Sequence, residues 1–355
     1  MNKKIKLHRF IDCAVPVHLC NFRCHYCYIL QHKLFDNYVK DPDHSPEEFG
    51  KALSIKRMGG ICLFNFCGGG ETLLMSRFLD YAYEVLKQGH YIMIVTNGTC
   101  FDKFEQMKKW PKDYIERTFF KFSYHYQQLK EKKLLDKYFQ NISDLRKLGF
   151  SFTVELVPYD ELIPLIDDII SYPLKYLGAL PHVTVSRDET KAGLPILTSL
   201  SKEEYYKTWC SFNSKLFEFK YSIFNVKRKE FCFAGLNSCY LSMATGTATQ
   251  CYCSYRATNI YNRKFNFPGP IGYKCAEEHC YNGHAWLTFG NIPGLETPTY
   301  LEMRDRKSSF GYNWVNDKMA FIMSQKIHVK HACLSKIIWN IKNFVRLLRG
   351  KLCRK

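Results

Sequence analysis

Long apolar runs are missing from this sequence, which restricts where the protein can reside. No stretch of about 18 apolar residues occurs, so we expect no transmembrane helix. The first ten residues, MNKKIKLHRF, are basic and lack the apolar core of a secretory signal peptide. Solenoid-type repeats and low-complexity segments are also absent from the sequence. We therefore expect a globular protein that stays in the cytoplasm.

Acidic residues are scarce in comparison with basic ones. The 33 Asp and Glu residues are outnumbered by 51 Lys and Arg residues, which gives a formal net charge of +18. Such a surplus suggests an acidic partner: nucleic acid, an anionic substrate or an anionic membrane surface.

The segment 318–355 contains no acidic residue at all. Its apolar residues recur at helical spacing while Lys and Arg occupy other faces, which predicts a basic amphipathic helix. Such a helix can lie on the inner face of an anionic membrane or dock on the rest of the protein. Aromatic residues do not alternate with these charges, so nucleic acid is a disfavoured partner. The apolar residues are Leu334, Ile337, Ile338, Ile341, Phe344, Val345 and Leu348.

Short apolar runs alternate with helical segments in the first half of the chain. This alternation is typical of parallel βαβ units, and six units are too few for a full eight-stranded barrel. We therefore predict an α/β fold, a partial (βα)6 barrel. Strands are expected at 10–18, 61–66, 91–95, 118–123, 150–157 and 182–186, and helices at 45–56, 72–87, 129–148, 160–171 and 201–217.

The composition changes after about residue 228. Residues 231–294 are rich in Cys, Tyr, Gly and Asn and show little helical periodicity. We interpret this part as a small cysteine-rich α+β module organised by metal. The predicted division is a barrel over 1–200, a linker helix over 201–228, the module over 229–300 and the basic tail over 301–355.

Cysteine is abundant, with 16 residues, and three of them form the octapeptide CNFRCHYC. In a reducing compartment, dense cysteine favours metal ligation or catalysis over disulfides. The thiolates of Cys20, Cys24 and Cys27 could hold zinc or an iron–sulfur cluster, both of which normally take four ligands. Three thiolates on a cubane cluster would leave one iron open for a substrate or cofactor. The alternative is a loop with three buried thiols.

The pattern C-x3-C-x-aromatic-C after a first strand resembles the signature of the radical S-adenosylmethionine superfamily. The resemblance implies a [4Fe–4S] cluster on Cys20, Cys24 and Cys27, with S-adenosylmethionine chelating the open iron and Tyr26 near its adenine. It also implies reductive cleavage to a 5′-deoxyadenosyl radical, hydrogen abstraction from a substrate, and an external electron donor of the flavodoxin or ferredoxin type.

Further motifs follow the predicted strands. FCGGGETL resembles the family motif that contacts the methionine amino group, which implies a cofactor contact for Gly69, Gly70 and Glu71; a glycine turn with a capping Glu71 is the alternative. By their positions at strand ends, Ser123, Glu155 and Arg187 are also assigned to the cofactor. His125 is interpreted as an exposed side chain, with substrate contact as the alternative.

The spacing C-x13-G-x4-C from Cys232 to Cys251 resembles the start of the auxiliary-cluster module of the SPASM and twitch subgroups. Cys275 and Cys280 could complete a four-thiolate site, while Cys239, Cys253 and His284 are spare candidates. A structural zinc site on the same residues is the competing interpretation. Cys67 could line the first site. The remaining cysteines are interpreted as small buried or incidental thiols: Cys13, Cys62, Cys100, Cys210, Cys333 and Cys353.

The resemblance covers roughly residues 8–295 and leads to a functional hypothesis. We expect a radical S-adenosylmethionine enzyme with a probable auxiliary iron–sulfur cluster, which oxidises or modifies a saccharide-type or other small substrate. A membrane-bound tail would make a lipid-linked saccharide a natural substrate. The alternatives are a peptide- or RNA-modifying enzyme of the same superfamily and a non-catalytic zinc-binding scaffold.

Overall fold

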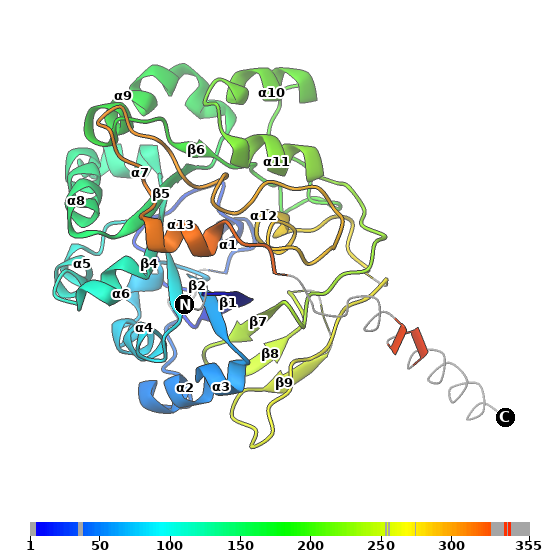
Figure 1. Ribbon diagram of the computed structural model, residues 1–355. Helices are drawn as coiled ribbons and strands as arrows, with labels where there is room; N and C mark the ends of the chain where they lie inside the picture. The colour runs from blue at the N-terminus through cyan, green and yellow to red at the C-terminus, as the bar shows by residue number, and fades with distance from the viewer. Residues whose placement is uncertain are drawn as a thin grey trace.

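The computed structural model describes residues 5–34, 38–252, 254, 256–273, 275–327, 337–338 and 340–341. A single open sheet of nine strands lies at its centre, with helices packed around it (Figure 1). The first six strands run parallel in the order of the chain, which confirms the predicted α/β partial barrel. The strands are β1 Leu7–Val15, β2 Ile61–Gly68, β3 Tyr91–Thr96, β4 Thr118–Ser123, β5 Ser151–Leu156, β6 His182–Val183, β7 Ser238–Ser242, β8 Thr247–Thr249 and β9 Ala257–Asn259.

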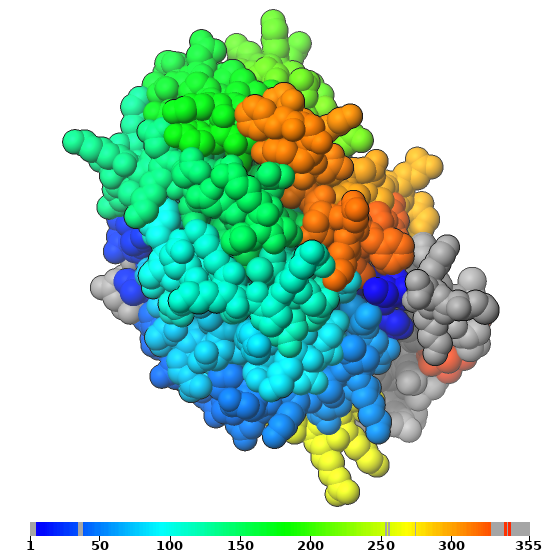
Figure 2. All heavy atoms as spheres, turned by 60° about the vertical axis from the view of Figure 1, so that its left-hand side comes forward, coloured from blue at the N-terminus to red at the C-terminus, as the bar shows by residue number. Residues whose placement is uncertain are grey.

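The cysteine-rich part continues the same sheet. Strand β7 pairs in parallel with β1 on the side opposite β2, and β8 and β9 follow it in antiparallel order. The strand order is therefore β6-β5-β4-β3-β2-β1-β7-β8-β9. The loop that follows β9 protrudes from the body of the molecule (Figure 2). The sequence did not indicate this pairing, because the residues of a five-residue strand do not show which other strand it will pair with.

Helices fill the connections between the parallel strands. They are α1 Tyr28–Gln31, α2 Pro46–Ala52, α3 Ile55–Met58, α4 Phe78–Lys87, α5 Phe101–Met107, α6 Lys112–Glu116, α7 Tyr126–Glu131, α8 Leu135–Leu148, α9 Ile166–Leu177, α10 Lys202–Cys210, α11 Lys215–Ile223, α12 Gly283–Trp286 and α13 Asp317–Met323, with 3-10 turns η1 Thr72–Leu74 and η2 Asp160–Leu165.

Local sequence signals explain several helix ends. The side chain of Ser45 accepts a hydrogen bond from the Glu48 amide, while the Glu48 carboxylate accepts one from the Ser45 amide, so a capping box starts α2. Helix α8 ends at Gly149, whose φ of +106° favours glycine.

Several predicted helices are divided in the structure. The helix expected over 45–56 is split into α2 and α3, and the helix expected over 129–148 into α7 and α8. A 3-10 turn replaces the first part of the helix expected over 72–87, and another does so over 160–171. The strand expected over 182–186 is only two residues long. The apolar spacing runs across these breaks, so it could not reveal them.

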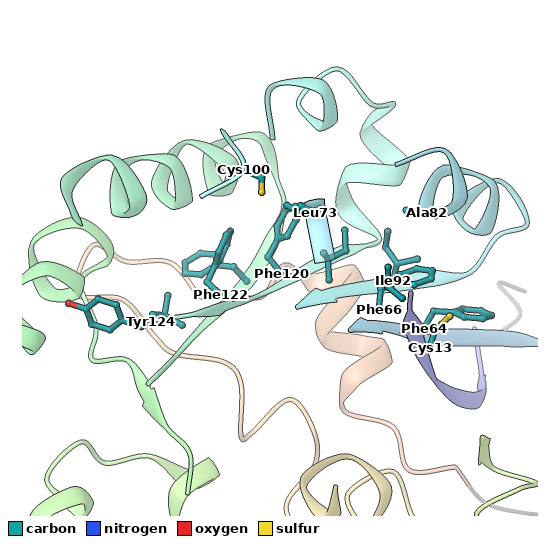
Figure 3. Close-up of a cluster of buried hydrophobic side chains, with 14 of the residues drawn as sticks. Cys13, Phe64, Phe66, Leu73, Ala82, Ile92, Cys100, Phe120, Phe122 and Tyr124 are labelled. Carbon is teal, nitrogen blue, oxygen red and sulfur yellow. The ribbon is translucent and has the colours of Figure 1, made fainter. Parts of the chain in front are cut away.

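The two faces of the sheet bury different side chains. On the outer face, Phe64, Ile92 and Phe120 pack against the surrounding helices in the largest apolar cluster (Figure 3). On the inner face, alternate residues such as Leu63 and Phe119 pack against α12, α13 and the segment around them. Because neighbouring strand residues point to opposite faces, each of the strands β1 to β4 contributes to both clusters.

Residues 301–327, the orange segment in Figures 1 and 2, pack on the inner face against residues near the starts of β1 to β4, such as Leu7 and Phe119. The side chain of Asn316 caps α13 and also donates to the carbonyls of Glu116 and Gly149. The predicted basic helix over 334–348 lies outside the described residues, apart from four positions. Within the described part of the chain, no helix has both the length and the apolar character needed to cross a bilayer.

Candidate active site

A pocket opens at the carboxyl ends of β1–β4 and surrounds about 700 Å³ of empty space. Seven of the residues predicted to bind the cluster or the cofactor line this pocket, although they come from three separate strand ends. They are Cys20, Cys24, Cys27, Gly69, Gly70, Glu71 and Ser123. Cys67 lines it as well, which agrees with the sequence interpretation. The remaining lining residues are Phe22, Tyr28, Ile29, Gly68, Thr72, Val95, Thr96, Asn97 and His125.

The three cysteines are held by the loop that joins β1 to α1. The Cys27 amide donates to the Cys24 carbonyl at 2.9 Å, which forms a turn that leads into α1. Cys24 is buried, and Cys20 and Cys27 are half-buried. Burial raises the pKa of Cys24 to about 12, and it also raises the pKa values of Cys20 and Cys27. A metal that binds here must therefore displace thiol protons.

The glycine run after β2 packs closely against the start of the cysteine loop. The Gly70 amide donates to the Val17 carbonyl at 2.8 Å, and the Glu71 amide donates to the Leu19 carbonyl at 2.9 Å. A Cβ atom on Gly70 would lie 2.1 Å from the Leu19 carbonyl oxygen, a distance that no side chain tolerates. Glycine is therefore required for the contact that fixes the segment just before Cys20.

Glu71 organises the loop after β3. Its buried carboxylate accepts hydrogen bonds from the Asn97 amide at 2.6 Å, the Thr96 hydroxyl at 2.7 Å and the Leu73 amide at 3.0 Å. Burial raises the pKa of Glu71 above its ordinary value. An ionised carboxylate has about four lone-pair sites, so one remains for a further donor in the pocket.

Asn97, in the Asn-Gly turn that follows β3, also lines the pocket. Its side-chain nitrogen lies 3.9 Å from the Cys20 sulfur and donates to Asn21 at 2.7 Å. Asn97 therefore links the β3 end to the cysteine loop. The Asn-Gly dipeptide carries a strong turn signal, which hides any second role of the asparagine side chain.

Tyr26 lies behind the pocket wall rather than on it. Its hydroxyl is 2.6 Å from Nδ1 of His125, and its ring stacks on Tyr159 with centroids 4.5 Å apart. Burial lowers the pKa of His125 to about 4, so at neutral pH the ring is uncharged and Nδ1 can accept a hydrogen bond from the Tyr26 hydroxyl. The interpretation of His125 as exposed is wrong: it is half-buried and lines the pocket, because α7 begins just after it.

Glu155 and Arg187 do not line this pocket. Glu155 ends β5 on the inner face and lies 3.1 Å from Nε of the fully buried Arg304. Arg187 pairs with Glu189 at 2.8 Å, and its guanidinium lies 5.6 Å from the ring centroid of Tyr281. Their assignment to the cofactor stays a prediction, and the structure supplies protein partners for both side chains.

A second pocket brings together the four cysteines predicted as auxiliary ligands. Cys232, Cys251, Cys275 and Cys280 all line it, and it surrounds about 570 Å³ of empty space. The other lining residues are Arg228, Glu230, Ala234, Tyr252, Ile271, Glu277, His279, Tyr281, Asn282, Trp286, Leu287 and Ile292. Among the described residues, no three His, Cys, Asp or Glu side chains meet at a point that would hold a single metal ion.

Backbone contacts position these cysteines. The amide and carbonyl of Cys232 both pair with Gly272 at 3.0 Å. Gly246, with a φ of +71°, lies in the turn between β7 and β8, as its place in the sequence pattern indicated. Burial raises the pKa of Cys232 to about 12 and also raises that of Cys280.

Two of the three spare ligand candidates do not line the second pocket. Cys239 is buried in β7 near Cys62, and His284 is not among the lining residues. Cys253 lies outside the described residues. The four cysteines chosen from spacing are thus the ones that share this pocket.

A buried hydrogen-bond network on β1 adjoins the second pocket. One carboxylate oxygen of Asp12 accepts from Asn65 at 2.7 Å, while the other accepts from Asn282 at 2.8 Å and from the Tyr252 hydroxyl. Burial raises the pKa of Asp12, although these hydrogen bonds oppose the shift. Since Tyr252 and Asn282 line the second pocket, the inner face of β1 forms part of its support.

Comparisons with known proteins agree with this architecture. Residues 15–162 match the sequence model described as the Radical SAM superfamily. The structure of Streptococcus suis SuiB bound to its precursor peptide SuiA is 12% identical, with a TM-score of 0.50 and coverage of 74% of this chain and 64% of SuiB. The structure of SuiB bound to S-adenosylmethionine is also 12% identical, with a TM-score of 0.49 and coverage of 74% of this chain and 65% of SuiB. The structure of anSMEcpe with bound AdoMet is 17% identical, with a TM-score of 0.45 and coverage of 72% of this chain and 79% of anSMEcpe. No curated protein matches the chain.

The comparisons show which part of this chain is similar to known proteins. At 12% identity SuiB shows a common fold, and this chain spans only about 64% to 65% of the SuiB length. The segment that matches the superfamily contains the whole wall of the first pocket, from Cys20 to His125. Residues 15–162, which form part of the open α/β barrel, are thus the segment that is similar to the Radical SAM superfamily.

Proposed function

We propose that this protein is a radical S-adenosylmethionine enzyme. The observation that carries the proposal is the first pocket, where three cysteine thiols, a close-packed glycine run and Glu71 meet at the ends of four strands. When bound there, a [4Fe–4S] cluster and S-adenosylmethionine supply the 5′-deoxyadenosyl radical that abstracts hydrogen from a substrate. The three thiols fit such a cluster because they leave space on the pocket side for the cofactor.

The protein's own residues then have distinct roles. Cys20, Cys24 and Cys27 would hold the cluster, and Gly70 lets the glycine run pack closely on the segment that leads into these cysteines. The remaining acceptor site of Glu71 can bind an ammonium group. Ser123 lies on the same wall, where it can contact a ribose.

We further propose that the second pocket holds an auxiliary iron–sulfur cluster of the SPASM or twitch kind. A zinc ion draws four thiolate sulfurs to about 2.3 Å from its centre. Among the described residues, no three His, Cys, Asp or Glu side chains converge in this way, so the four cysteines of the second pocket suit a group larger than one ion. Such a cluster could bind substrate or accept an electron from it, so that the overall reaction is an oxidation. An external donor such as flavodoxin or ferredoxin would supply the electron for cofactor cleavage.

The two clusters can be counted separately. Protein purified and reconstituted without oxygen should contain about eight iron atoms and about eight sulfides per chain. Replacing Cys20, Cys24 and Cys27 by Ala should leave about four irons, and replacing Cys232, Cys275 and Cys280 by Ala should also leave about four. A Cys210→Ala variant, which changes a cysteine outside both pockets, serves as the control. Zinc without sulfide in the wild type would support the scaffold alternative instead.

The class of substrate must be inferred from this chain. SuiB has been solved with its precursor peptide, but a likeness at 12% identity concerns the fold. A peptide substrate therefore remains the second candidate beside a small molecule of the saccharide type. Cytoplasmic location and membrane contact through residues 318–355 stay predictions, since most of that segment lies outside the described residues.

A further inference from the structure

Four basic side chains gather on the inner side of the sheet, and we call them the cationic cluster: Lys121, Arg187, Lys220 and Arg304. Lys121 shares the inner face of β4 with Phe119 and Ser123. Arg187 follows β6, and Lys220 comes from α11, which packs against β6. Arg304 lies in the segment that leads to α13 (Figure 1). Four elements that are distant in sequence thus bring positive charge to one region.

The charges in this region lie close enough to affect one another. Burial alone would raise the pKa of Glu155, but Arg304, Lys121 and Lys220 together bring it below its ordinary value. Burial and the neighbouring Arg187 lower the pKa of Lys220 to about 7. Three members of the cationic cluster thus act on Glu155, and the fourth, Arg187, acts on Lys220.

The cationic cluster also adjoins both cysteine pockets. On one side, the Arg187 guanidinium lies 5.6 Å from the Tyr281 ring, which lines the second pocket. On the other side, Gln31 donates to the Arg187 carbonyl at 3.2 Å and to the Tyr26 carbonyl at 3.0 Å, which ties this residue to the cysteine loop. Lys121 also lies two residues before Ser123 on the same face of β4, and Ser123 lines the first pocket.

The carboxylates nearby do not balance these cations. Glu155 pairs with Arg304 and Glu189 pairs with Arg187. Asp12, the third acid on this side, already accepts hydrogen bonds from three side chains. Among the described residues, two ammonium groups are thus left without a carboxylate at ion-pair distance.

These two ammonium groups belong to Lys121 and Lys220. Within the described part of the chain, Lys121 has neither a hydrogen bond nor an ion pair, and Lys220 donates only to the Thr184 hydroxyl at 2.5 Å. Both lysines are half-buried, and a partly buried charge without a partner is unfavourable.

We propose that the substrate of this enzyme is a small molecule with an anionic group, and that Lys121 and Lys220 bind this group. Phosphate, sulfate and carboxylate groups share the required charge and acceptor oxygens. The inference rests on the proposed function, since it places the substrate next to both cysteine pockets. Bound in this way, the anion would fix one end of the substrate while its reacting carbon faces the first pocket.

Anion binding can be measured on the reconstituted protein by isothermal titration calorimetry at constant ionic strength. The probes are sulfate, which represents phosphate-like groups, and malonate, which represents carboxylates; neutral glycerol is the blank. We expect binding of at least one anion and at least about ten-fold weaker binding by the Lys121→Gln/Lys220→Gln variant, because a charge-assisted hydrogen bond contributes about 1.5–3 kcal/mol. Lys112→Gln, whose side chain is 85% exposed, is the control and should bind as the wild type does.

The outcomes separate the substrate inference from the proposed function. Stronger binding of sulfate supports a phosphate-like substrate group, and stronger binding of malonate supports a carboxylate. Equal binding by the wild type and the double variant overturns the inference, even if the same preparation releases 5′-deoxyadenosine. Lysine-dependent binding in a preparation that takes up no iron overturns the proposed function instead. Thermal melting of each variant verifies that it is folded.

The pH dependence of sulfate binding gives an independent readout. Lys220 is cationic below its pKa of about 7, so sulfate should bind more tightly at pH 6 than at pH 8, and Lys220→Gln should flatten this profile. A wild-type profile that is flat between these pH values would contradict the role of Lys220. Burial holds the pKa of His279 at about 4 and that of His284 well below its ordinary value, so neither should titrate in this range. The other charged groups facing Lys220 are Glu155, Arg187, Lys121 and Arg304.

Discussion

Replacing Arg304 by Met is expected to lower the free energy of unfolding by about 3–5 kcal/mol, because Glu155 would be left as a partly buried charge without its partner. The Arg304 side chain is fully buried and that of Glu155 is 15% exposed, so water can compensate little for the loss. Thermal and urea denaturation of the two proteins would measure the difference.

Two variants make this prediction specific. In Glu155→Gln/Arg304→Met the unpaired charge is removed, so part of the lost stability should return. Arg77→Met, which breaks an ion pair between side chains that are 53% and 59% exposed, should cost at most about 1 kcal/mol. Equal losses for Arg304→Met and Arg77→Met would show that the buried pair does not stabilise the fold.

The stability effect of the pair also has a defined pH dependence. The folded-state pKa of Glu155 lies below its ordinary value, so its stabilising contribution is present above that ordinary value and is lost as the pH falls through the folded pKa. The difference between the wild type and Arg304→Met should therefore shrink below about pH 4.

Replacing Gly70 by Ala is expected to reduce cofactor cleavage by about 100-fold or more, since catalytic geometry displaced by about 1 Å can cost that much. The new Cβ would lie 2.1 Å from the Leu19 carbonyl oxygen, and the contact partner is backbone, which cannot turn aside as a side chain could. The segment before Cys20 must then shift away from the glycine run. Release of 5′-deoxyadenosine, measured by chromatography and mass spectrometry, gives the effect.

Gly311→Ala is the matched control for this variant. Its Cβ would meet no atom within 4 Å, and its φ of +86° adds only local strain, far from both pockets. This variant should keep its iron and its activity. If Gly70→Ala cleaved the cofactor as fast as Gly311→Ala, the close packing of the glycine run on the cysteine loop would have no functional importance.

Much of the barrel could be predicted from the sequence because each strand is a short apolar run with its own boundary signals. Strand β4 was predicted with its bounds, and β3 within one residue, since polar residues or glycine bracket both. The pairing of β7 with β1 could not be predicted, because it depends on contacts between residues about 230 positions apart. The same holds for Arg304, which lies in a segment interpreted as tail and yet pairs with Glu155.

In the candidate site, too, some residues could be identified from the sequence and others could not. Cysteine spacing and the glycine run identified residues that line one pocket, because the ends of parallel strands meet at one edge of a sheet. Asn97 and His125 were missed, since a turn signal and an isolated histidine have simpler explanations in the sequence. Lys121 stood within an apolar strand, FKFS, and an inward-facing lysine there was the available signal for the cationic cluster.

The most direct test of the account is release of 5′-deoxyadenosine from S-adenosylmethionine by the anaerobically reconstituted protein with dithionite as reductant. We expect release by the wild type and none above background by the variant in which Cys20, Cys24 and Cys27 are replaced by Ala, while Cys210→Ala should match the wild type. A wild-type protein that holds its full iron and sulfide but releases no 5′-deoxyadenosine would contradict the proposed function, as would equal release by the triple variant.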